Sequence, residues 1–319
     1  MKNTNITKTI EDSIKKEVLS LNIINVLVAL SGGPDSITTI YILKKLGLTI
    51  TALHCNFHLR GEESNRDMDF VKEFCFSQEI PLQIKEFNIK EFRQNNKGNS
   101  TEMICRKLRY KWFEEKLKKM SYDRIVTGHN ADDNIETFFL NMLRGSGTRG
   151  LKGIQKDNGV IWRPLLNYHR NEILEFIKEN NLEYITDSTN FTNDFRRNYL
   201  RNEIIPLLRK EWKGFDSSMD KTIQNIENEN KIIEESLKKE ISCGKHSLSV
   251  TSILNYPAPI LLIKRFIDPL NPFTKTPEEV LASIRANKPH IRVWNLRKGT
   301  LYLQNGNLFI KMIHSERCS

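Results

Sequence analysis

The stretch LVALSGGPDSITTI, Leu27–Ile40, decides the expected fold of this 319-residue chain. Its apolar start predicts a buried β-strand and its apolar end predicts a helix, so a short polar turn must join the two. Gly32 and Gly33 in that turn let the backbone approach a ligand closely and direct N–H groups at an anion. Pro34 suits the first helical turn, where its missing N–H removes no hydrogen bond.

The polar side chains of this turn are suited to phosphate. Ser31 and Ser36 can donate hydrogen bonds to phosphate oxygens, and the positive end of the helix dipole adds to the attraction. Asp35 would repel a phosphate unless a cation such as Mg²⁺ lies between them. The Lys-Ser/Thr ending of a Walker A loop is missing, which indicates another kind of phosphate chemistry. The alternative is an ordinary strand–helix turn in which Asp35 and Ser36 only begin the helix.

The alternation of strand and helix continues along the chain. Strands are predicted over residues 48–56, 81–89 and 123–130, and helices over 62–78, 101–120, 131–144, 163–182 and 193–210. This α/β pattern predicts a parallel sheet with helices on both faces. Ligands bind such sheets at the carboxyl ends of the strands, so the turn Ser31–Ser36 and the segment Gly128–Asp133 should share one edge.

The rest of the chain has a different character. A charged, weakly amphipathic stretch predicts a connecting helix, and the tail predicts a small α+β domain. Within the tail, helices are expected at 257–267 and 276–286, the second beginning with a capping box of Thr276, Pro277 and Glu279. Asn305-Gly306 suits the type I′ turn of a closing hairpin. The expected parts are residues 1–214, 215–242 and 243–319.

The charge of the chain favours a polyanionic partner. The 49 basic residues exceed the 39 acidic ones, and between Lys85 and Met120 there are 11 basic against 5 acidic residues. Arg106 and Arg109 lie in this basic segment, and their partner could be an acidic substrate, RNA or solvent. A solvated helix face is the alternative interpretation unless a site lies nearby.

The cellular setting follows from what the sequence lacks. The five cysteines form no C-x-x-C pair and no zinc spacing, no apolar run has membrane-spanning length, and the first residues do not resemble a signal peptide. We therefore expect a soluble, cytoplasmic protein that does not bind membranes.

A second polar cluster lies in TGHNADDNIET, Thr127–Thr137. Asp132 and Asp133 open a predicted helix, and Glu136 follows three and four residues later, so all three can share one face. On the edge that carries the phosphate loop, this favours a metal or amine site. Acidic residues that only offset the helix dipole are the alternative. His129 could assist the site or be structural.

Four further arginines are candidate anion ligands. Arg144 and Arg149 lie in the glycine-punctuated loop RGSGTRGL, and Arg197 and Arg201 lie four apart on one helix face, which suits nucleic-acid phosphates. The loop with Arg144 and Arg149 could instead be an ordinary helix C-terminus. The helix with Arg197 and Arg201 could equally be solvated, with its arginines paired to neighbouring acidic residues.

Taken together, the motifs resemble one known family. SGGPDS is the signature of PP-loop (N-type) ATP pyrophosphatases, which have a Rossmann-like fold. From about residue 23 to 210, the chain resembles tRNA(Ile)-lysidine synthetases in HCNFHLRGEES, MICRKLRY, GHNADDNIET, RGSGTRGLKGI, RPLL, DSTN and RRNYLRNEIIP. Phe57, His58, Asn130 and Asn134 depart from the residues expected there, whereas the phosphate loop and the three carboxylates match.

The resemblance implies a C–N ligase. ATP would adenylate the C2 carbonyl oxygen of the wobble cytidine in isoleucine tRNA with a CAU anticodon, and the ε-amine of L-lysine would displace AMP to give lysidine. It implies ATP on Ser31, Gly32, Gly33, Pro34, Asp35, Ser36 and His129, and Mg²⁺ on Asp35 and Asp132. It further implies the lysine amine on Asp133 and Glu136, and either the adenylated intermediate or the lysine carboxylate on Arg106. It also implies tRNA on Arg144, Arg149, Arg197, Arg201 and the tail. The resemblance leaves open whether the chain forms a homodimer.

Two other functions remain as alternatives. A tRNA thiolase of the same superfamily would need a sulfur carrier, but Cys55 and Cys105 lie in predicted strand and helix core, where cysteine is usually inert. A non-catalytic RNA-binding protein on a degenerate scaffold should have lost the loop serines, Asp35 or the paired carboxylates, and all of these are present.

Overall fold

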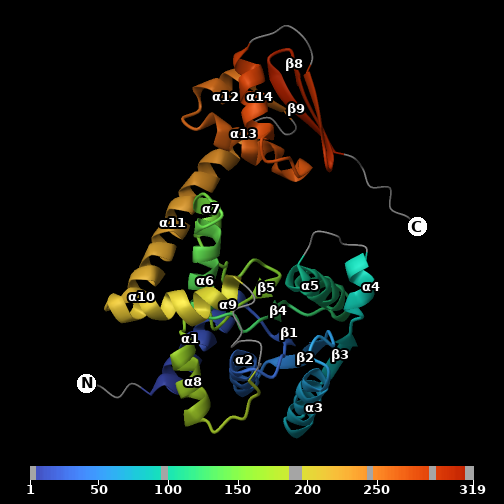
Figure 1. Cartoon of the computed structure of the whole chain (residues 1–319), viewed down its shortest axis with the longest axis vertical. Helices are drawn as coiled ribbons and strands as arrows, with labels where there is room; N and C mark the ends of the chain where they lie inside the picture. The colour runs from blue at the N-terminus through green and yellow to red at the C-terminus, as the bar shows by residue number, and fades with distance from the viewer. Residues whose placement is uncertain (1–4, 95–99, 187–195, 243–246, 287–291, 313–319) are drawn as a thin grey trace. The chain divides into compact units, whose positions relative to one another are not determined.

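The chain folds into two compact units, Met1–Ile226 and Glu227–Ser319 (Figure 1). The computed structural model describes residues 5–94, 100–186, 196–242, 247–286 and 292–312. The boundary between the units falls inside one long helix, α11 (Phe215–Ser242), which covers the stretch predicted as a connecting helix. Each unit has its own apolar core.

A parallel five-stranded sheet forms the centre of the first unit and confirms the predicted α/β class. Its strands lie in the order β3-β2-β1-β4-β5, namely β3 (Leu82–Glu86), β2 (Thr49–Asn56), β1 (Asn25–Ala29), β4 (Arg124–Val126) and β5 (Ile161–Trp162). The edge strand β5 has only two residues, too few to produce a recognisable pattern in the sequence.

Helices cover both faces of this sheet, as the alternating side chains of β1 require. Val26 and Val28 pack in the core under α1 (Ile6–Leu21), α2 (Pro34–Lys45), α3 (Glu62–Ser77) and α8 (Arg170–Glu179). Leu27 points to the opposite face, where it packs with α4 (Ile89–Gln94) and α5 (Thr101–Met120). The central strand is therefore buried on both sides, as expected for a parallel sheet.

The helices that follow β4 depart from the prediction in two places. They are α6 (Ala131–Met142), α7 (Thr148–Leu151), α8, α9 (Arg196–Tyr199), the π-helical turn η2 (Leu200–Ile204) and α10 (Ile205–Glu211). The prediction of helix from residue 163 is wrong because the chain turns before α8, whose N-terminus is fixed by the His169 N–H donating to Glu172. The predicted helix 193–210 is interrupted by η2 immediately before Pro206, which lacks an N–H.

The second unit is a small α+β domain, as predicted. An antiparallel sheet has the order β6-β9-β8-β7, with β6 (Ser247–Ser249), β9 (Asn307–Met312), β8 (Gly299–Gln304) and β7 (Arg292–Leu296). Its core is shared with α12 (Val250–Asn255), α13 (Pro259–Ile267), the short helix η3 (Asp268–Leu270) and α14 (Thr276–Arg285). Among the described residues, no helix has both the length and the apolarity to cross a membrane.

Two details of the tail test local predictions. The hairpin turn is confirmed, because Asn305 and Gly306 have φ of 47° and 70°, as a type I′ turn requires. The capping box is wrong: α14 begins after Lys275, which makes no side-chain capping bond, and Thr276 is buried inside the helix.

Close packing between the loops after β1 and β4 leads to a first prediction. A Cβ at Gly128 would lie 2.9 Å from the backbone C and O of Asp35. We expect Gly128→Ala to lower the free energy of unfolding by roughly 1–3 kcal/mol through overpacking. Gly147→Ala is the control, because a Cβ there meets no atom within 4 Å. Urea unfolding measures both, and equal losses would mean that the two loops can separate freely.

Candidate functional site

The turn after β1 is a compact, hydrogen-bonded loop at the carboxyl edge of the sheet. Ser36 Oγ donates to Gly33 O at 2.9 Å and lies 3.2 Å from Ser31 Oγ. Gly32 has φ of +87°, and a Cβ there would lie 2.6 Å from Ile185 Cδ1, so a glycine is required. The backbone thus leaves this strand in a tight turn that only a glycine at position 32 can form.

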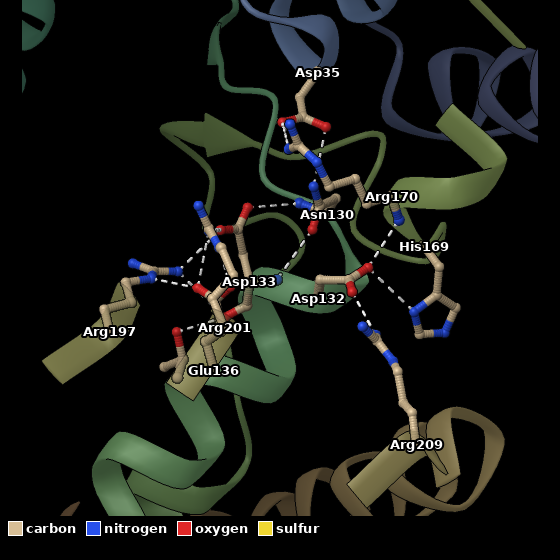
Figure 2. A network of polar contacts seen from close by, with 11 residues as sticks. Asp35, Asn130, Asp132, Asp133, Glu136, His169, Arg170, Arg197, Arg201 and Arg209 are labelled. Carbon is tan, nitrogen blue, oxygen red and sulfur yellow. Dashed lines mark hydrogen bonds and ion pairs between the residues drawn. The ribbon is translucent and has the colours of Figure 1, made fainter. Parts of the chain in front are cut away.

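Asp35 connects this loop to the loop after β4 (Figure 2). Asn130 Nδ2 donates to one carboxylate oxygen at 3.0 Å, and Arg170 Nη1 donates to the other at 3.3 Å. Burial raises the pKa of Asp35 to about 6, although Arg170 acts in the opposite direction and Asp133 adds to the increase. Asp35 therefore links the loop after β1 to Asn130 at the start of α6 and to Arg170 of α8.

The start of α6 places Asp133 next to Asp35, and Glu136 next to Asp133. Asn130 caps the helix by accepting the Asp133 N–H at 3.0 Å, and the Asp133 carboxylate accepts the Asn130 N–H at 3.1 Å. One turn later, Glu136 is only 1% exposed. The capping box fixes the orientation of Asp133, and the helix places Glu136 beside it.

Two arginines of the segment α9–η2 bind these carboxylates. Arg197 Nε and Arg201 Nε each donate to Glu136 at 2.6 Å, and both guanidinium groups also donate to Asp133 Oδ1, at 3.0 and 3.3 Å. Burial alone would lower the pKa of the two arginines, but the carboxylates raise it, so both stay charged. Arg197 and Arg201 do face one way, as predicted, and that way is towards the carboxylates.

Asp132 has partners that Asp133 and Glu136 do not share, and Arg170 links this second network to Asp35 (Figure 2). Asp132 accepts the Arg170 N–H at 2.8 Å, is bonded by Arg209, and lies 3.4 Å from His169 Nδ1. Burial acts to raise its pKa, but these partners hold it well below the usual range. His169 also contacts Asp220 at 2.9 Å, and its pKa rises to about 10 because of these two carboxylates.

A cavity of about 550 Å³ opens between the two networks. Glu136 and Arg201 line it from one network, and Asp132 and Arg209 line it from the other. Nothing in the sequence pattern identified His169, Arg170 or Arg209, because their roles come from side chains that meet only in the folded chain.

His129 lies in the segment between β4 and α6. Its Nδ1 is 2.8 Å from Thr127 Oγ1. Burial lowers its pKa to about 3, and Arg163 and Arg106 are the next largest causes. The ring is therefore neutral at physiological pH. Arg106 itself is exposed on α5, with its guanidinium 4.9 Å from the centre of the Tyr110 ring.

The other predicted residues lie apart from this network. Arg144 and Arg149 are exposed near α7. The motif DSTN, residues 187–190, and Cys243 and Cys318 lie outside the described residues.

Asp35 is the predicted metal ligand that lies within the phosphate loop, whereas Asp132 lies at the start of α6. Among the described residues, no three side chains form a ready metal cage. Mg²⁺ commonly binds through one or two carboxylates plus substrate phosphates, which Asp35 fits. In both residues the two oxygens already accept hydrogen bonds, those of Asp35 from Asn130 and Arg170 and those of Asp132 from the Arg170 N–H and Arg209, so a metal ion would displace a partner at either one.

Comparison with known proteins gives a consistent result. The family model described as a PP-loop domain matches residues 3–208. The tRNA(Ile)-lysidine synthases of Bacteroides thetaiotaomicron and Parabacteroides distasonis are 37% and 38% identical to the chain, over 81% and 73% of its length. The chain spans only 61% and 54% of those relatives.

A solved structure shares the fold. The U34-tRNA thiolase NcsA from Methanococcus maripaludis with its [4Fe-4S] cluster superimposes with a TM-score of 0.58 at 21% identity, covering 71% of this chain and 81% of that one. At that identity the likeness concerns the fold alone.

The buried, neutral His129 leads to a second prediction. In the unfolded chain a histidine titrates near pH 6.5, whereas in the folded chain His129 resists protonation down to about pH 3. Its contribution to stability is therefore present above pH 6.5 and is lost as the pH falls. Acidification from pH 7 to 5 should cost about 2 kcal/mol at this residue.

His129→Gln removes the titrating group. Between pH 7 and 5, the free energy of unfolding of this variant should therefore fall by less than that of the unchanged chain. Urea unfolding at pH 7 and 5 measures the difference. If both proteins lose the same free energy of unfolding, folding does not lower the pKa of His129.

Proposed function

We propose that this chain, which belongs to the PP-loop domain family, is a tRNA(Ile)-lysidine synthetase. The observation that carries the proposal is the position of Asp133 beside Asp35, with Glu136 one turn further along α6, at the edge that holds the phosphate loop. An anionic seat for an amine then lies next to a place for ATP. The names of the relatives support the choice of lysine and of isoleucine tRNA.

The first proposed step is adenylation of the RNA base. The C2 carbonyl oxygen of the wobble cytidine attacks the α-phosphorus of ATP, a P–O bond forms, and pyrophosphate leaves. The glycine turn at Gly32 and Gly33 and the N-terminus of α2 bind the phosphates. Ser31 and Ser36 add hydroxyl donors. Mg²⁺ carried with ATP would neutralise phosphate charge, with Asp35 as its protein ligand.

The second proposed step is attack by the lysine ε-amine at C2, which breaks the bond to AMP. The amine must lose its proton to attack, so a carboxylate has to bind the ammonium and accept that proton. We assign this role to Asp133, whose side chain is 17% exposed. Glu136, 1% exposed and bonded by both arginine Nε groups, holds Arg197 and Arg201 in place.

The tRNA contacts are assigned to exposed cations. Arg144 and Arg149 near α7 face solvent and can reach phosphates without breaking the carboxylate network. Arg197 and Arg201 would have to exchange a carboxylate contact for a phosphate contact. We also propose the second unit as a tRNA-binding domain and the cytoplasm as the location.

A tRNA thiolase is the less favoured alternative. Burial raises the pKa of the Cys55 thiol to about 12 even though Arg109 acts to lower it, and burial raises that of Cys75 to about 11. Cys105 is buried. Thiols that stay protonated are poor sulfur nucleophiles.

The deciding experiment follows radiolabelled lysine into RNA. Purified protein is incubated with ATP, Mg²⁺, labelled lysine and isoleucine tRNA with a CAU anticodon. Label that enters the RNA only with ATP supports the proposal. If no label enters while the tRNA still stimulates pyrophosphate release, adenylation stands and another nucleophile, sulfur first, must be tested.

The assigned base leads to a third prediction. Asp133→Asn keeps the shape of the capping box but removes the negative charge, so lysine transfer should fall at least about a hundredfold while the melting temperature changes little. Asp69→Asn is the control, because that carboxylate is 62% exposed on α3. Near-normal transfer by Asp133→Asn would refute the assignment.

The proposed tRNA contact of Arg144 leads to a fourth prediction. If Arg144 binds a phosphate, Arg144→Gln should weaken tRNA binding and reduce the slope of log K against log salt concentration by about 1. Filter binding at several salt concentrations measures the slope. An unchanged slope would assign this arginine to an ordinary solvated helix end.

A further inference from the structure

A second group of cations lies on the α5 side of the phosphate loop. Arg106 lies over one ring, with its guanidinium 4.9 Å from the centre of Tyr110, and the Tyr110 side chain is also a hydrogen-bond partner of Arg163. Arg109 lies 5.4 Å from the centre of the Phe57 ring and is near Cys55 of β2. These three arginines extend from the end of β2 to the end of β5.

The three arginines lack acidic partners. Among the described residues, none of them forms an ion pair, whereas Arg170, Arg197, Arg201 and Arg209 all do. Asp157 is the acidic residue that acts on Arg163, but its carboxylate is bound by Arg124 at 3.2 and 3.4 Å. The positive charge on this side of the edge is therefore uncompensated.

Arg163 is the most demanding member of the group. Arg163 is only 6% exposed. Its Nη1 donates to Gln155 O at 2.5 Å, and its Nε is buried without a hydrogen-bond partner. Burial lowers its pKa, since a desolvated cation without a carboxylate is costly. A buried cation of this kind requires either a ligand that pairs with it or other interactions that offset its energetic cost.

The phosphate loop itself contains no positively charged side chain. No lysine or arginine occurs between Leu27 and Ile40, and Arg170, the cation that contacts the loop residue Asp35, is already paired with it. A phosphate bound there needs positive charge from another part of the chain. Of the uncompensated arginines, Arg109 acts on His54, whose Nδ1 is 2.9 Å from Leu30 O directly after β1. Arg163 directly follows β5, at the carboxyl edge of the same parallel sheet.

We propose that Arg163, together with Arg106 and Arg109, forms a phosphate-binding recess that receives a phosphate group of the reactants. Its ligand is the pyrophosphate released from ATP or an RNA phosphodiester next to the reacting nucleotide, and this choice of sources rests on the proposed function. Arg163 is the fixed, buried member, and the arginines of α5 close over the anion from the solvent side.

The test measures binding rather than turnover. Pyrophosphate is titrated into the full chain by calorimetry, and an RNA stem-loop with a CAU loop is titrated at several salt concentrations. Arg163→Gln should weaken at least one of these ligands about tenfold or more, because hydrogen bonds to charged groups are strong. Arg66→Gln removes an equal charge from α3, where the side chain is 61% exposed, and should change neither affinity.

The two ligands identify the source. Loss of pyrophosphate affinity alone assigns the recess to the leaving group, and loss of RNA affinity alone assigns it to a phosphodiester. If Arg163→Gln does not fold, Arg109→Gln, a half-buried position, is read in the same way. Unchanged affinity for both ligands in a folded variant overturns the recess. Neither titration requires lysine transfer, so a failure of the proposed function would be seen separately.

Discussion

The candidate site depends on one buried amide. Asn130 is 3% exposed, and three of its hydrogen bonds join it to Asp35 and Asp133: its side chain donates to Asp35 and accepts from the Asp133 N–H, and its own N–H donates to Asp133. A buried amide that loses a partner is costly, so each bond stabilises the other two. This residue therefore fixes the distance between the phosphate loop and the carboxylates of α6. It stands where the family resemblance leads one to expect another residue, and it fills the position with a helix cap.

Charge is distributed unevenly around this centre, and the imbalance is informative. On the side of α8 to α10, four arginines and His169 are matched by Asp35, Asp132, Asp133 and Glu136. On the side of α5, three arginines have no acidic partner among the described residues, and His129 is kept neutral beside them. Paired charges fix the geometry of a site, whereas unpaired ones attract a ligand of opposite charge. One half of the edge thus has paired charges, whereas the other half carries uncompensated positive charge.

The sequence predicts the parts of this site that depend on local order. Gly32 and Gly33 after an apolar run, and Asp132, Asp133 and Glu136 at a helix start, follow strands of a parallel sheet, and the topology of such sheets brings both groups to one edge. Contacts between distant segments leave no such pattern. The separation of Asp132 from Asp133, its binding to Arg209, and the burial of Arg163 depend on how α8, α10 and β5 pack, so the sequence could not reveal them.

The π turn before Pro206 links backbone chemistry to the site. In an unbroken α-helix, Arg209 would lie about 80° around the axis from Arg201, since each residue turns the helix by about 100°. The Ile205 N–H bonds to Leu200 O, five residues back, so η2 holds one residue more than an α-helical turn. That extra residue turns Arg209 back by about 100°, onto nearly the same face as Arg201. Both arginines can then line one cavity, with Arg201 on Glu136 and Arg209 on Asp132. The π turn before Pro206 thereby places the two arginines so that one helical segment binds the carboxylates of both networks.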